Sequence, residues 1–136
     1  MDTAIAPRAC PATLHLPLPS SMQAPHEARQ TAERLMAVRS AACPRSIAGD
    51  IVLIVSELVT NAIRHANGPY ALTFTLEDGR AGIAVSDGSA ELHRHHGGRQ
   101  RLEPGGRGLK IIRALGADLF VSPCAHGKQV IAVLTW

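Results

Sequence analysis

Three polar residues that could bind a ligand recur at intervals of four within one apolar segment of the chain. They are Glu57, Asn61 and His65. In a helix, which turns by about 100° per residue, side chains spaced four apart lie along one ridge. A carboxylate, an amide and an imidazole on one ridge could converge on a single ligand. The alternative is an ordinary solvated helix face.

The segment that carries this ridge is predicted to be a helix from Ile51 to Ala66. It contains no Gly or Pro, and apolar residues at 51, 54, 55, 58 and 62 follow helical spacing. Ser46 or Asp50 could cap its start, and Asn67-Gly68-Pro69 would end it. The ridge lies at the margin of the apolar arc, where a helix meets both the core and a cleft.

A glycine cluster at the start of another predicted helix could bind an anion. Gly105, Gly106, Arg107 and Gly108 precede Leu109 and an amphipathic segment. Backbone N–H groups are free at a helix start, the helix dipole favours an anion there, and the missing Cβ atoms let phosphate oxygens approach. Arg107 could pair with a phosphate or be solvated. The alternative is a plain glycine turn, and the pattern is neither a Rossmann fingerprint nor a P-loop.

A third candidate is Asp87, which follows a segment that is predicted to be a buried strand and precedes Gly88. A carboxylate in that position can accept a hydrogen bond from an exocyclic amine. The alternative is an Asp-Gly turn.

The elements that would position these residues follow from periodicity and turn residues. A helix is predicted from Pro25 to about Arg39, and a long polar stretch without periodicity runs from Ala90 to Gly106. Strands are predicted at 12–16, 70–76, 81–86, 118–122 and 129–135, with turns at 77–80 and around 126–128. This order indicates an α+β fold, a two-layer α/β sandwich with helices on one face of a mixed, mostly antiparallel sheet.

Composition narrows the functional classes. The 136 residues indicate one domain at 12–136, after a disordered N-terminus at 1–11. The net charge of +3 is small and scattered, and with four aromatic residues it argues against nucleic-acid binding. No apolar run reaches the length of a membrane span. The three cysteines are widely separated and indicate reduced thiols, so we expect a cytoplasmic protein. We also expect that it does not bind a membrane.

Taken together, three motifs resemble those of the GHKL (histidine-kinase-like) ATPases. They are SELVTNAIRHA at 56–66, VSDGS at 85–89 and GGRGLKII at 105–112. They are similar to the N, G1 and G2 boxes of that family, and the chain most resembles the small stand-alone domains related to bacterial anti-sigma-factor serine kinases. The resemblance implies the Bergerat-type ATP-binding fold. It also implies ATP and Mg²⁺ as cofactors.

The same resemblance implies a role for each candidate residue. Asn61 would bind Mg²⁺, Glu57 would be the catalytic carboxylate that polarises the attacking hydroxyl, and Asp87 would bind the adenine amino group. The remaining cofactor-binding candidates are His65, Gly88, Gly105, Gly106, Arg107, Gly108 and Leu109, with a lid spanning roughly Gly88 to Gly105. Many relatives have their glycine two positions after the aspartate, whereas here Gly88 follows Asp87 directly. This difference concerns how the adenine pocket is built.

The leading functional hypothesis is an ATP- and Mg²⁺-dependent serine/threonine protein kinase that phosphorylates an anti-anti-sigma-type partner and binds a sigma factor. Relatives of this type are often homodimers. The alternative is a non-catalytic module in which ATP orders the lid and so controls partner binding. A small adaptor without nucleotide is a third reading. The cluster of His93, His95 and His96 is expected to be a solvated lid loop rather than a metal site.

Overall fold

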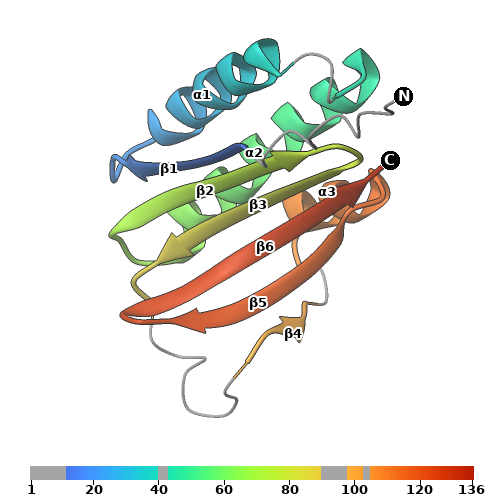
Figure 1. Cartoon of the computed structure of the whole chain (residues 1–136). Coiled ribbons are helices and arrows are strands. Elements are labelled where there is room, and N and C mark those ends of the chain that lie inside the picture. The colour runs from blue at the N-terminus through green and yellow to red at the C-terminus, as the bar shows by residue number, and fades with distance from the viewer. Residues whose placement is uncertain (1–11, 40–42, 90–97, 103–104) are drawn as a thin grey trace, which may run out of the picture.

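Six antiparallel strands form one sheet in the order β1-β2-β3-β6-β5-β4 (Figure 1). Their bounds are β1 Ala12–Leu18, β2 Tyr70–Glu77, β3 Arg80–Asp87, β4 Gln100–Arg101, β5 Asp118–Cys124 and β6 Gly127–Thr135. The structure is a computed structural model that describes residues 12–39, 43–89, 98–102 and 105–136. The expected disorder at 1–11 and the histidine cluster at 93–96 lie outside these residues.

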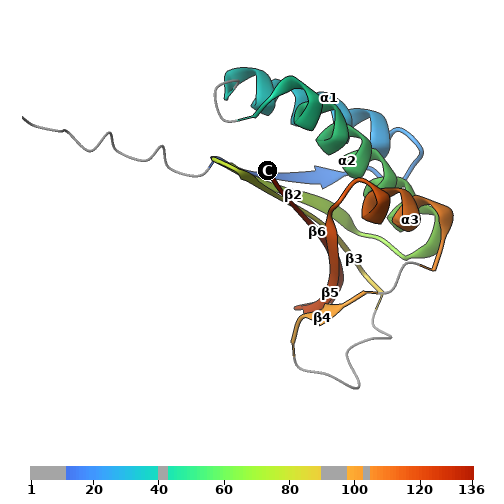
Figure 2. The ribbon, with the colours of Figure 1, turned by 90° about the vertical axis from the view of Figure 1, so that its right-hand side faces the viewer.

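The described residues form three helices that cover one face of the sheet, and none of these helices lies on the other face (Figure 2). They are α1 Ala24–Val38, α2 Arg45–His65 and α3 Arg107–Ala114. The predicted two-layer α+β sandwich is therefore confirmed. Every pairing between described strands is antiparallel, so the expected mixed character of the sheet is absent from this part of the chain.

The core lies between the helices and the sheet and is almost wholly aliphatic. In β2 and β3 buried residues alternate with half-buried ones, as expected for strands with one face on the core. The side chains that α2 places against this face are Ile51, Ile54, Val55, Leu58, Val59 and Ala62. Asp87 is the single buried polar or charged residue among the described residues, with 4% of its surface exposed. A buried charge is unfavourable unless neighbouring groups compensate it, so the partners of the Asp87 carboxylate matter for the fold.

Several predicted boundaries were wrong. Helix α2 begins at Arg45 rather than Ile51, and neither Ser46 nor Asp50 caps it. Ile47 and Ala48 pack against the core, so tertiary contacts extend the helix through Gly49. Strand β1 continues two residues beyond Leu16 to Leu18.

Two further elements differ from the prediction. Strand β4 lies inside the stretch that was expected to be a loop, and Gln100 and Arg101 pair there with β5. Strand β6 begins at Gly127, so Lys128 belongs to the strand rather than to a turn. Residue Lys128 pairs with Asp87 of β3 in the register of the sheet. The polar residue opposite Asp87 was therefore missed by the sequence prediction.

Helix α2 is long and apolar enough, with a mean hydropathy of 1.6, to meet the length and composition criterion for a membrane span. Core helices of globular proteins meet the same criterion. In this fold α2 packs against α1, α3 and the sheet. The criterion is therefore weak evidence for a membrane span.

Candidate functional site

A cavity of about 210 Å³ opens where the C-terminal half of α2 faces β3, β6 and the start of α3. Its walls are mainly aliphatic, and they include Leu58, Val85, Leu109, Val121 and Val130. Four polar side chains line the same space, namely Asn61, His65, Asp87 and Lys128. A cavity smaller than the usual drug-sized range of about 300–1,000 Å³ suits a single planar ring between apolar walls.

The ridge on α2 is directed at this cavity over its last two turns. Asn61 is half-buried, His65 is exposed, and both line the cavity. The Asn61 amide has no hydrogen-bond partner among the described residues, so its oxygen is available to a ligand. Glu57, one turn earlier, does not line the cavity and faces α3 instead.

Glu57 and Gly108 are in direct contact. A Cβ atom at Gly108 would lie 2.7 Å from Glu57 Oε2, which is too close for any side chain to fit without a shift. The carboxylate thus lies against the first turn of α3, where the helix dipole favours negative charge. The Glu57 carboxylate occupies the space that a Cβ atom at Gly108 would take, so a larger residue there would displace this carboxylate.

The other glycines at the start of α3 are in open space. A Cβ atom at Gly105 or Gly106 would meet no atom within 4 Å, so packing does not require glycine at either position. Gly106 is the N-cap, without any side chain that caps the helix, and Arg107 is exposed. The first backbone N–H groups of α3 are therefore accessible to an anion. Leu109, two residues on, is buried and contributes to the cavity wall.

Asp87 lies at the inner end of the cavity with its carboxylate held on both oxygens. The Ser89 backbone N–H donates to Oδ1 at 2.8 Å, and Lys128 Nζ donates to Oδ2 at 2.6 Å. The side chain of Asp87 is 1% exposed and that of Lys128 is 19% exposed. The ammonium group therefore compensates the buried carboxylate, which would otherwise be very unfavourable.

Gly88 belongs to a junction of three glycines beneath this carboxylate. A Cβ atom at Gly88 would overlap the Gly68 carbonyl oxygen, and one at Gly127 would overlap the Asp87 carbonyl oxygen. The Gly88 backbone N–H donates to the backbone carbonyl oxygen of Asn67 at 2.6 Å, and the Asn67 backbone N–H donates to Ser89 Oγ at 3.1 Å. A glycine directly after Asp87 is therefore required where the α2–β2 loop crosses the end of β3.

Two hydrogen bonds fix α2 at the level of the ridge. The Tyr70 hydroxyl donates to the Ala66 carbonyl at 2.6 Å and satisfies one of the free carbonyls at the end of α2. Arg29 of α1 donates through Nη1 to Ser56 Oγ at 3.0 Å, next to Glu57. Because α1 covers that side, the ridge is held from both ends.

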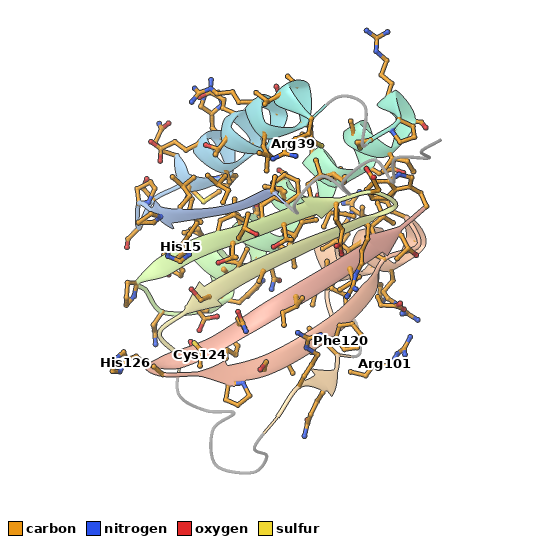
Figure 3. The ribbon with its side chains drawn as sticks, viewed as in Figure 1. His15, Arg39, Arg101, Phe120, Cys124 and His126 are labelled. Carbon is orange, nitrogen blue, oxygen red and sulfur yellow. The ribbon has the colours of Figure 1, made fainter. Side chains whose placement is uncertain are left out.

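Part of the expected lid is attached to the sheet. Within β4 and its flanks, Arg99 lies 5.5 Å from the ring centroid of Phe120, and Arg101 pairs with Asp118 at 3.1 Å. Figure 3 shows Arg101 and Phe120 together at this edge, with Cys124 and His126 at the β5–β6 turn. Residues 90–97 and 103–104, which belong to the expected lid, lie outside the described residues.

A second, more open hollow of about 590 Å³ lies between α1 and the start of α2. None of the predicted site residues reaches it. Burial raises the pKa of the Cys43 thiol at its edge, which keeps that thiol protonated. The described residues contain no group of three or more His, Cys, Asp or Glu side chains that could hold a metal ion. A metal at the site would thus need ligands from a bound molecule in addition to Asn61.

Comparison with known protein families identifies the class of protein to which this fold and cavity belong. The sequence matches the family described as the histidine kinase-like ATPase domain over residues 18–134. Because this match spans most of the chain, the chain belongs to that family.

A solved structure shows the same fold. It is the crystal structure of the RsbU and RsbW domains of Rv1364c from Mycobacterium tuberculosis, with a TM-score of 0.63 and 21% sequence identity. The alignment covers 91% of this chain and 32% of the other, so this chain corresponds to about a third of that protein. A comparison with curated proteins gives no match.

Proposed function

We propose that the chain is an ATP- and Mg²⁺-dependent regulatory protein that acts as a serine/threonine kinase on an anti-anti-sigma-type partner. The observation that carries this proposal is the convergence of Asn61, His65 and Asp87 on one apolar cavity beside the start of α3. Family membership and the RsbW-containing structural neighbour support it.

The base would bind at the inner end of the cavity. Aliphatic walls of Leu58, Val85 and Val130 suit the faces of a planar ring, and the buried carboxylate of Asp87 can accept a hydrogen bond from an exocyclic amine. A carboxylate offers about four acceptor positions, of which Ser89 and Lys128 use two. Asp87 therefore retains capacity for an adenine amino group.

The phosphates would lie at the outer end. The free N–H groups at the start of α3, with Gly105 and Gly106 in open space, can approach an anion closely. Arg107 is exposed beside them and can pair with a phosphate oxygen. The Asn61 oxygen and phosphate oxygens are suitable ligands for Mg²⁺, which when bound neutralises phosphate charge. His65 lies on the same cavity rim and would contact the nucleotide.

Glu57 would accept the proton of the attacking hydroxyl. Its carboxylate has no hydrogen-bond or ion-pair partner among the described residues and faces the first turn of α3. A general base must reach the attacking group within about 3 Å or through one water. The contact with Gly108 places the carboxylate next to the proposed phosphate site, which suits this role.

The resemblance and the RsbW domain of the structural neighbour support the proposed protein partners. An anti-anti-sigma-type protein would be the phosphate acceptor, and a sigma factor would be the second partner of a homodimeric form. The alternative is a module in which nucleotide binding alone controls these contacts. It would use the same base and phosphate sites without the chemistry of Glu57.

The deciding experiment mixes the chain with γ-labelled ATP, Mg²⁺ and a panel of small anti-anti-sigma-type proteins. We expect label on a serine or threonine of one of them, and none when Mg²⁺ is removed. Tight binding of both ATP and a cognate partner without transfer would contradict the kinase function and leave the binding module. Failure to bind ATP would exclude both.

A further inference from the structure

The Asp87–Lys128 pair is unusual because Lys128 lines the cavity from the strand opposite and none of the sequence motifs includes it. The two residues pair in the register of β3 and β6, and their side chains meet at 2.6 Å. Both line the same cavity. A ligand that reaches the carboxylate must therefore also meet the ammonium group.

The ammonium group has unused hydrogen-bonding capacity. A lysine has three N–H donors, and within the described residues Lys128 uses one of them, to Asp87 Oδ2. Its side chain is 19% exposed, so contact with solvent is limited. A ligand acceptor that satisfies a remaining donor in this partly desolvated place would therefore gain a charge-assisted hydrogen bond.

We propose that Lys128 is a base-recognition residue that donates a hydrogen bond to the ring nitrogen N1 of adenine while Asp87 accepts from the adjacent amino group. This inference rests on the proposed function, and it adds a specificity-determining residue to the site. Carboxylate and ammonium present an acceptor beside a donor. The Watson–Crick edge of adenine presents the complementary order, the amino group as donor and N1 as acceptor.

The close spacing of the two groups supports simultaneous contact. Bidentate side chains recognise a base by pairing one donor and one acceptor with neighbouring groups on its edge. Ser89 holds Asp87 by Oδ1, and Lys128 contacts Oδ2, so the pair is fixed before the base arrives. Because the carboxylate has further acceptor positions, Lys128 need not leave when the amino group binds.

The test compares three nucleotides on the unmodified protein by calorimetry in the presence of Mg²⁺. They are ATP, 1-deaza-ATP, in which a C–H group replaces N1, and 7-deaza-ATP, in which a C–H group replaces N7 of the five-membered ring and N1 is kept. We expect ATP and 7-deaza-ATP to bind alike and 1-deaza-ATP to bind about 10- to 100-fold more weakly, as for a lost hydrogen bond to a charged donor. Equal binding of all three would overturn the role of Lys128 and leave the proposed function intact.

A variant tests whether Lys128 itself causes the weaker binding of 1-deaza-ATP. Lys128→Met keeps the unbranched apolar part of the side chain and removes the ammonium, so we expect it to bind ATP and 1-deaza-ATP with equal affinity. Persistence of the difference in a folded Lys128→Met protein would overturn the assignment, as would tighter ATP binding by this variant, which would show that Lys128 blocks the site. Because removal of Lys128 leaves Asp87 unpaired, the nucleotide series on the unmodified protein decides the question if the variant does not fold. Failure of the unmodified protein to bind any of the three would overturn the proposed function and this inference together.

Discussion

The α-carbon of Gly108 faces the carboxylate of Glu57 so closely that a Cβ atom there would lie 2.7 Å from Oε2. This contact joins the ridge of α2 to the first turn of α3. The proposed base therefore lies beside the proposed phosphate site, and a change at Gly108 should act through Glu57.

Gly108→Ala should slow phosphate transfer to the partner about tenfold while ATP affinity changes less. The new methyl group displaces the carboxylate, which lies at the end of a flexible side chain, so the free energy of unfolding should change by no more than about 1 kcal/mol. In a Glu57→Gln background the same change should have little further effect on transfer. An equal loss of ATP affinity would place the Gly108 α-carbon against the nucleotide instead.

Glu57→Gln should keep ATP affinity within a few-fold and lose phosphorylation by about 10² or more. The amide retains the shape of the side chain but cannot accept a proton as the carboxylate does. Phosphate transfer depends mainly on positioning and charge neutralisation, so loss of the base reduces turnover more than binding. Single-turnover transfer rates and calorimetric affinities measure the two effects separately. Undiminished transfer would remove Glu57 from the chemistry.

Gly88→Ala should destabilise the protein by about 1–3 kcal/mol, because its methyl group would overlap the backbone carbonyl of Gly68. The control is Gly82→Ala within β3, the strand that ends just before Gly88, where a Cβ atom would meet nothing within 4 Å. Thermal denaturation should show a midpoint lowered by several degrees for Gly88→Ala and an unchanged or slightly raised one for Gly82→Ala. Coinciding midpoints would mean that the junction of glycines is not close-packed.

ATP with Mg²⁺ should protect Arg99 and Arg101 from trypsin. Arg99 directly precedes the two-residue strand β4 and Arg101 ends it; both are exposed, and the local stability of this edge of the sheet is expected to be low. Nucleotide would add an anion at the start of α3, a few residues further along, and reduce the local opening of this edge. Mass spectrometry of a limited digest gives the cleavage rate at each site. Identical rates with and without ATP would argue against an ordered lid.

Much of the fold could be predicted because its local signals are strong. The alternation at Tyr70–Glu77 and the Asp-Gly turn that follows define a hairpin, and the apolar spacing along α2 defines a helix. The start of α2 was missed because packing of Ile47 against the core outweighs the local preference of Gly49 and Asp50.

The candidate site was predictable where its residues lie close together in sequence. Asn61 and His65 share a helical ridge, and both line the cavity with Asp87. Lys128 was missed because its relation to Asp87 depends on the pairing of β3 with β6, strands separated by about forty residues. The contact between Gly108 and Glu57 could not be predicted from the sequence either, because it depends on how α3 packs against α2.

The most direct test is a calorimetric titration of ATP into the protein, with and without Mg²⁺, carried out in parallel on Asn61→Ala. Alanine forms helices better than asparagine, so this variant should remain folded, which a circular dichroism spectrum checks. We predict saturable binding of ATP by the unmodified protein that Mg²⁺ strengthens, and no Mg²⁺-dependent binding by folded Asn61→Ala. Absence of ATP binding by the unmodified protein, or identical Mg²⁺-dependent binding by both proteins, would contradict the proposed site.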